Sequence, residues 1–336
     1  MSVVPQLLLM LVVILIAAEL FTNAVEHLGE QLGISEGVTG SLFAAMATAM
    51  PESTIPLVAI FAGTADAAVN AEIGIGAILG APLMLATLSF AVTGASVLGR
   101  RGWAGHIRPE RSGLSRDLTF FLLGFGLAIL GLWIPESQRL ARALLALTLV
   151  ATYIVYVLRT IKVSAQLVEA GHGTEAHSEM YLCRAGLPDH GVVIGLQVLV
   201  GVTLLVLGAK GCVDAVEQVA AGSGVSALLL SLLIIPVATE LPENVNSLLW
   251  IRRGKDTLAI GNITGAMVFQ GCLLPAMGIL MTPWTPTPPV LAGVALAYAA
   301  GLWLLWHAQR GDLRVWHLGV NGLFYAGFIL VLFRTT

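Results

Sequence analysis

Charged residues are scarce in this sequence: only 11% of the 336 residues are Asp, Glu, Lys or Arg, whereas 57% are hydrophobic. A water-soluble domain of this size needs a charged surface, so the shortage excludes a soluble globular protein. The sequence also lacks basic patches with interleaved aromatic side chains, which excludes nucleic acid as a partner. The lipid bilayer is therefore the expected surroundings of the chain.

Cysteine is equally rare. Cys183, Cys212 and Cys272 stand far apart and form no CxxC pair, which excludes a disulfide framework and a thiolate metal site. The sequence shows neither a nucleophile beside a base nor a His/Asp metal cluster at membrane depth. We therefore expect no enzymatic activity and no cofactor. Residues Met1 to Ala18 lack the basic start of a cleavable leader, so we expect them to belong to the first membrane span.

Long hydrophobic runs recur along the whole chain. Each has roughly 18 to 25 residues, enough for a helix to cross ~30 Å of hydrocarbon. The predicted spans are 4–27, 36–62, 70–98, 117–134, 139–158, 190–217, 225–251, 256–281, 287–307 and 314–333. The sequence thus predicts an all-α polytopic membrane protein with about ten transmembrane helices.

Basic residues gather in the connections on one side of these spans. They are Arg100, Arg101, Arg108, Arg111, Arg116, Arg159, Lys162, Arg184, Arg252, Arg253, Lys255, Arg310 and Arg314. The positive-inside rule makes that side cytoplasmic, together with the polar linker 159–189. An even number of spans then places both termini outside, and we expect the protein in the inner membrane of a prokaryotic cell.

The chain contains an internal repeat. Asn23 to Glu26 matches Asp214 to Glu217, and Ala47 to Glu52 matches Ala238 to Glu243; both pairs are separated by the same 191 residues, from 23 to 214 and from 52 to 243. This register divides the chain into a first transmembrane repeat (1–158), the linker (159–189) and a second repeat (190–336). Five spans per repeat make the second repeat inverted, an arrangement typical of secondary transporters.

Two matched glutamates carry the chemistry. Glu52 and Glu243 lie about midway along their spans, where an ionised side chain costs several kcal/mol unless it is paired or faces water. Each follows a proline, Pro51 or Pro242, which removes a backbone donor and breaks the helix. Both repeats carry this energetically costly glutamate at equivalent positions. The duplication indicates that the glutamates have a function and are not accidental neighbours of a proline kink needed for packing.

Oxygen atoms surround both positions in the sequence. The prolines free carbonyls one turn earlier, in the segments of Ala47 and Ala238, and Thr48 and Thr239 add hydroxyl groups. Oxygen-only ligands are those that Ca²⁺ and alkali ions prefer, and the matched segments contain no histidine for a softer metal. Inorganic cations are therefore the expected partners.

A second matched element is rich in small residues. Gly74, Gly76 and Gly80 in the first repeat, and Gly261 and Gly265 in the second, allow another helix to approach closely. Next to the Pro-Glu helices these segments would form a wall of the site. Asn262 and Gln270 are its polar candidates.

These segments resemble the calcium/cation antiporter superfamily, which includes the sodium/calcium exchangers. Its two repeats each carry a G-T-S-x-P-E segment, matched here by Ala47 to Glu52 and Ala238 to Glu243, and a G-N-x-x-G-S-N segment, matched by Gly76 to Pro82 and Gly261 to Met267. The resemblance implies that the two glutamates bind Ca²⁺, that the threonines and carbonyls complete sodium sites, and that the halves give alternating access.

The chain departs from that pattern where the family has serine and asparagine. Glu240 and Ala49 replace the motif serines, and Ala266 and Met267 replace the second-repeat serine and asparagine. We expect a secondary-active antiporter that exchanges Ca²⁺ or a related divalent cation for Na⁺. If Glu240 faces the site, a three-carboxylate, proton-coupled exchanger is the alternative; a cation channel and an intramembrane enzyme are further ones.

Overall fold

The computed structural model describes residues 3–31, 50–63, 66–169, 179–188, 190–224 and 226–335, which are organised as helices. The helices are α1 (Val3–Gln31), α4 (Met50–Ala62), α5 (Ala67–Met84), α6 (Phe90–Arg101), α7 (Arg111–Gly131), α8 (Arg139–Glu169), α9 (Tyr181–Arg184), α10 (Gly191–Ser223), α11 (Ala227–Thr239), α12 (Leu241–Arg252), α13 (Asp256–Met281), α14 (Pro288–Arg310) and α15 (Val315–Thr335). A π-helical turn, η2 (Leu85–Ser89), joins α5 to α6. The all-α prediction is confirmed.

Seven helical stretches in the described part of the chain are long and apolar enough to cross a membrane. Three shorter apolar stretches, Pro5–Phe21, Glu52–Ala62 and Ala227–Val237, lie within the remaining predicted spans 4–27, 36–62 and 225–251. The structure thus agrees with about ten spans. The span predicted at 225–251 is interrupted between α11 and α12, and the first part of 36–62 lies outside the described residues.

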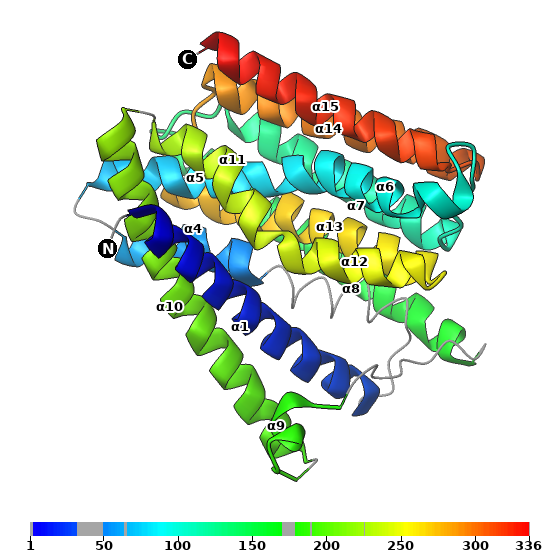
Figure 1. The fold of residues 1–336 in the computed structure, drawn as a ribbon. Coiled ribbons are helices and arrows are strands. Elements are labelled where there is room, and N and C mark those ends of the chain that lie inside the picture. The colour runs from blue at the N-terminus through cyan, green and yellow to red at the C-terminus, as the bar shows by residue number, and fades with distance from the viewer. Residues whose placement is uncertain are drawn as a thin grey trace.

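The helices pack side by side as a bundle (Figure 1). α1 lies against α10 on one flank, α14 lies against α15 on the opposite flank, and α5, α11 and α13 lie between them. The start of α1 and the end of α15 lie at the same end of the bundle. The predicted linker 159–189 begins within α8, which continues to Glu169.

Polar contacts join the two repeats at the other end of the bundle. Both terminal guanidinium nitrogens of Arg101, Nη1 and Nη2, donate to the Asp256 carboxylate at 2.7 and 2.8 Å. The Arg108 backbone N–H donates to the same carboxylate at 2.8 Å. Arg100 donates to the carbonyl of Arg252 at 3.0 Å. The connections α6–α7 and α12–α13 are therefore held together at the end where the predicted cytoplasmic arginines gather.

Buried apolar side chains form two large clusters. One is built by α6, α7, α8, α12, α13, α14 and α15 with one face of α5, and the other by α1, α4 and α10 with another face of α5. α11 contributes Leu232 to the first cluster and Ile235 to the second. The helix of Glu52 and the helix of Glu243 thus belong to different clusters.

Glycines allow α5 and α11 to touch. A Cβ atom on Gly76 would lie 2.5 Å from Cβ of Ser231, and one on Gly80 would lie 2.6 Å from Cγ of Pro236 and 2.7 Å from the carbonyl oxygen of Leu232. Real Cβ atoms do not approach that closely, so a side chain at either position would push the helices apart. The close approach predicted from the small-residue spacing is confirmed for α5.

We expect Gly80→Val to lower the thermal unfolding temperature of the detergent-purified protein. Overpacking of a tight contact costs about 1–3 kcal/mol because neighbouring helices must shift. Gly195→Val is the matched control, since nothing lies within 4 Å of a Cβ at that position in α10. Equal unfolding temperatures for the two variants would contradict the tight α5–α11 contact.

Candidate cation site

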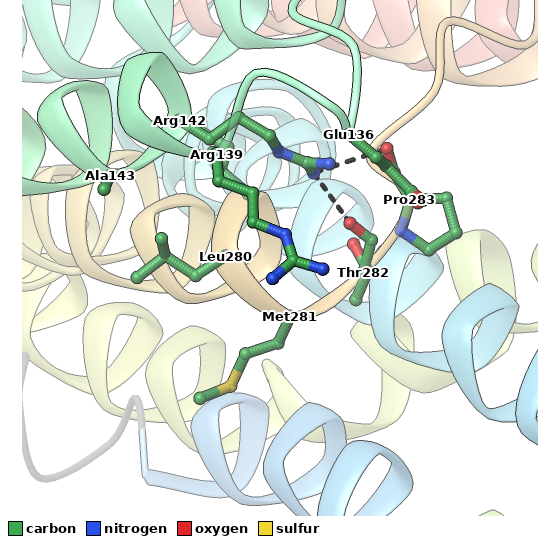
Figure 2. Close-up of a pocket in the computed structure, with 9 residues that line it drawn as sticks. Glu136, Arg139, Arg142, Ala143, Leu280, Met281, Thr282 and Pro283 are labelled. Atoms are coloured by element: carbon green, nitrogen blue, oxygen red, sulfur yellow. Dashed lines mark hydrogen bonds between the residues drawn. The ribbon is translucent and has the colours of Figure 1, made fainter.

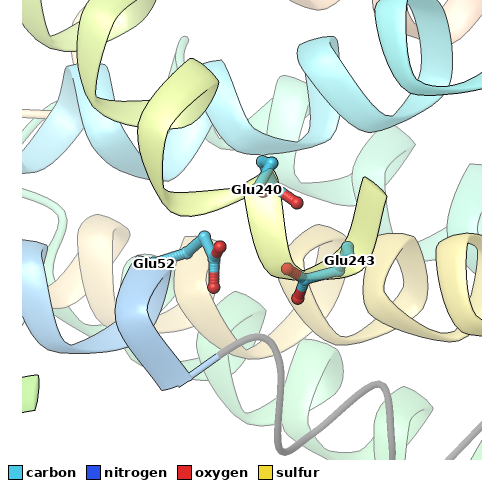
Figure 3. A group of neighbouring side chains, drawn as sticks. All are labelled: Glu52, Glu240 and Glu243. Carbon is cyan, nitrogen blue, oxygen red and sulfur yellow. The ribbon is translucent and has the colours of Figure 1, made fainter. Parts of the chain in front are cut away.

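Three glutamates meet in the interior of the bundle. One carboxylate oxygen from each of Glu52, Glu240 and Glu243 lies within 4.8 Å of the other two. Each residue is at most 1% exposed. Figure 3 shows Glu52 on one side and Glu240 and Glu243 on the other, around a common space. Such a group of carboxylates can hold a multivalent cation.

Two of these glutamates occupy equivalent places on their helices. Glu52 lies in the first turn of α4 and Glu243 in the first turn of α12, each directly after a proline. The two helices run from the middle of the bundle toward opposite ends (Figure 1), as inverted repeats require. The positive end of a helix dipole stabilises negative charge in its first turn, which favours both carboxylates.

Glu240 lies at the junction between α11 and α12 and faces the other two glutamates. Its backbone torsions, φ −77° and ψ 0°, turn the chain there, and its carbonyl accepts a hydrogen bond from the Asn244 side chain at 2.7 Å. The Glu240 Oε1 atom accepts a hydrogen bond from Nε2 of Gln270 at 2.9 Å. The Glu240 side chain therefore lies between the other two glutamates and Gln270 of α13.

The other predicted residues are partly placed. Asn262 of α13 donates from Nδ2 to the carbonyl of Glu243 at 3.3 Å. Thr239 is buried, and its hydroxyl donates to the carbonyl of Ile235 at 3.0 Å. Ala238 lies in the last turn of α11, where Pro242 has no N–H to offer its carbonyl. The predicted positions Ala47 and Thr48 lie outside the described residues.

Several buried oxygens around the cluster accept no hydrogen bond within the described structure. They are both carboxylate oxygens of Glu52, Oε2 of Glu240, Oδ1 of Asn262 and Oε1 of Gln270. A buried polar atom without a partner costs about 1–3 kcal/mol. A bound cation would remove that cost, because each of these atoms is an oxygen ligand of the kind that Ca²⁺ takes.

Sequence reasoning missed residues that support the site. The Ser247 hydroxyl lies 3.2 Å from Nδ2 of Asn262, and Ser247 shares a face of α12 with Glu243 because it follows by four residues. That spacing could have identified it. On α7, buried Asp117 accepts a hydrogen bond from the hydroxyl of Thr264 at 2.8 Å. This contact fixes α13 against α7 at Thr264, two residues after Asn262.

The sequence matches the family of sodium/calcium exchanger proteins over residues 2–162 and 194–334. The two matched ranges cover most of both repeats, so the chain belongs to this family within the calcium/cation antiporter superfamily. The resemblance drawn from the motifs is confirmed. The protein is an integral membrane cation antiporter and not an enzyme.

Curated relatives and solved structures agree with that membership. The chain is 27% identical to putative antiporter CaxA of Alkalimonas amylolytica over 291 residues, 87% of this chain and 82% of the relative. It is 23% identical to inner membrane protein YrbG of Escherichia coli (strain K12) over 332 residues, 95% of this chain and 92% of the relative.

Two solved structures share the fold. The H⁺/Ca²⁺ exchanger CAX superposes with a TM-score of 0.76 at 16% identity, covering 99% of this chain and 82% of that one. The sodium-calcium exchanger NCX_Mj superposes with a TM-score of 0.63 at 20% identity, covering 98% of each chain. Both likenesses confirm the polytopic membrane fold.

We expect Glu240→Gln to raise the unfolding temperature in the presence of a chelator at alkaline pH. The change removes one of three mutually repelling charges but keeps an oxygen for the Gln270 hydrogen bond. The rise should be about 2 °C or more, and it should vanish at acidic pH, where protons already neutralise the cluster. Glu179→Gln, which alters an exposed glutamate, should change nothing. A rise of equal size at both pH values would contradict the repulsion.

Proposed function

We propose that this antiporter moves a divalent cation, with Ca²⁺ the leading candidate, through a site formed by Glu52, Glu240 and Glu243. The observation that carries the proposal is the buried group of three carboxylates whose oxygens approach within 4.8 Å. Oxygen ligands and a high local negative charge suit Ca²⁺. The carbonyl of Ala238, the hydroxyl of Thr239 and the amide oxygens of Asn262 and Gln270 are proposed to complete the coordination.

Exchange, rather than leak, follows from the charge of the site. A buried cluster with its full negative charge is costly to carry across the hydrocarbon region, so the protein changes access only when cations neutralise it. A divalent cation and its counter-ion compete for the same oxygens. Each must leave before the other binds, which couples their movements in opposite directions.

We propose H⁺ as the counter-ion. One Ca²⁺ cancels two of the three carboxylate charges, so the third carboxylate keeps a proton while Ca²⁺ is bound. Two further protons can then replace the Ca²⁺ with no change in net charge and need no other ligands. The chain has lost several neutral ligands that a set of Na⁺ sites would use, since Ala49, Ala266 and Met267 stand at those positions. Glu240 adds a proton acceptor in their place.

Na⁺ is the second candidate. The family resemblance implies it, and one specific observation favours it. The amide oxygens of Asn262 and Gln270 are buried and accept no hydrogen bond within the described structure. Neutral oxygens of this kind suit an alkali ion.

We also propose that the end of the bundle formed by the Arg101 and Asp256 contacts faces the cytoplasm. The positive-inside rule supports this orientation because most basic connection residues gather there. The protein would then lie in the inner membrane of a prokaryotic cell with both termini outside.

Glu52→Gln and Glu243→Gln should each abolish Ca²⁺ exchange in proteoliposomes. Each change removes a charge that the divalent ion needs while keeping the shape of the side chain. Glu179→Gln, outside the site, should exchange at the wild-type rate. Wild-type Ca²⁺ flux in both site variants would disprove the assignment of the cluster.

The counter-ion can be identified by measuring which imposed ion gradient drives Ca²⁺ efflux from vesicles. With Ca²⁺ loaded inside the vesicles, an imposed pH gradient should drive Ca²⁺ efflux. Glu240→Ser should weaken that response, because it removes one of the three coupled carboxylates that can take up a proton. A Na⁺ gradient that drives wild-type efflux in the absence of a pH gradient would overturn H⁺ coupling and favour Na⁺. Ca²⁺ current without any counter-ion would indicate a channel.

A further inference from the structure

A polar pocket lies far from the glutamate cluster, where α13 ends. It has a volume of about 580 Å³ and is lined by Glu136, Arg139, Arg142, Ala143 and residues 279–283. Figure 2 shows Arg139 and Arg142 on its wall, beside Thr282 and Pro283 of the connection to α14. The Arg101–Asp256 contact lies at the start of α13, so the pocket is at the opposite end of the bundle.

Arg142 is buried in this wall, with 5% of its surface exposed. Its Nη2 atom donates to the carbonyls of Thr282 and Pro283 at 2.7 and 3.3 Å, while its Nε donor has no partner in the described structure. Among the described residues, no carboxylate forms an ion pair with Arg139 or Arg142. Glu136 attracts Arg142 electrostatically but is exposed and forms no ion pair with it. A buried guanidinium without a close ion-pair partner costs several kcal/mol, so this site favours an anion.

Three sources of positive charge converge on the pocket. Arg139 and Arg142 both lie in the first turn of α8, and that turn carries no acidic residue. Helix starts normally favour acidic side chains, because the dipole is positive there and the first N–H groups lack partners. Two cations at this place therefore form a strong anion-binding spot. Glu136, which is exposed, is the one lining residue of opposite sign and leaves a net charge of +1.

Exposed apolar side chains surround the same place. Leu140 is 74% exposed and Leu144 is 56% exposed on α8, and Leu280 is 55% exposed at the end of α13. α8 is a candidate membrane span that lies mostly on the outside of the bundle. The pocket is thus at the boundary between hydrocarbon and headgroups, where a lipid can reach it with both its phosphate and its chains.

We propose that this pocket binds the phosphate of an anionic phospholipid, with the acyl chains lying along Leu140 and Leu144. Guanidinium groups bind phosphate oxygens in a bidentate manner, which suits Arg139 at the mouth of the pocket and Arg142 in its wall. Because Arg142 also holds the carbonyls at the end of α13, the bound lipid stabilises the outer end of the helix that carries Asn262 and Gln270. The inference does not depend on which ions are exchanged.

The test uses the full chain purified in detergent, with phosphatidylglycerol, phosphatidylcholine and inorganic phosphate as probes. Native mass spectrometry gives the affinity for each lipid, and thermal unfolding gives the stabilisation by each probe. Arg139→Gln should bind phosphatidylglycerol about tenfold more weakly, the factor expected for one charge-assisted hydrogen bond. Because Arg139 is exposed, its variant should unfold at the wild-type temperature without lipid. Arg334→Gln, an exposed arginine at the same end, is the matched control.

Loss of phosphatidylglycerol binding in Arg139→Gln, with normal binding in Arg334→Gln, would support the proposal. Equal stabilisation by phosphatidylcholine would overturn it, since the headgroup charge would then play no part. If inorganic phosphate instead stabilised the wild type as much as the lipid does and had no effect on Arg139→Gln, a site for a free anion would replace the lipid site. If Arg139→Gln and Arg334→Gln lost phosphatidylglycerol binding equally, a specific site at this pocket would also be disproved.

Discussion

Repulsion among buried like charges is the constraint on which the centre of this protein depends. Glu52, Glu240 and Glu243 share a small volume that bulk water does not reach. The neighbouring amides are arranged accordingly: Asn262 and Gln270 donate their N–H groups to the carbonyl of Glu243 and the carboxylate of Glu240. Their oxygens then accept nothing within the described structure, which leaves them available to a cation.

The surrounding bundle places these charges at a boundary rather than inside one core. Glu52 comes from α4, which packs with α1 and α10, whereas Glu243 comes from α12, which packs with α13 and the helices beyond it. α5 and α11 contribute to both clusters and touch through glycine. A cation bound by all three carboxylates would therefore bridge the two apolar clusters.

Local patterns in the sequence were sufficient to predict the spans, the equivalence of Glu52 and Glu243 and the glycine contact, because each depends on spacing along one segment. The direction of Glu240 depends on the backbone torsions of a single residue between two helices, and no spacing rule fixes them. The Asp117–Thr264 hydrogen bond joins residues 147 positions apart, so it follows from the packing of α7 on α13 and not from either segment. The places of Ala47 and Thr48 stay predictions.

In a transporter of inverted repeats, the two access states are related by an exchange of the roles of the halves. That relation would make both faces of the membrane equivalent if the halves were identical at the site. Here Glu240 and Gln270 belong to the second half. Their matches in the first half are Ala49 and, by the offset that aligns Gly76 with Gly261, Leu85. The cation would leave a different set of oxygens when it departs toward each side. Unequal apparent affinities at the two faces are the expected result. The exchange rate should also differ when the same ion gradient is imposed in one direction and then in the other.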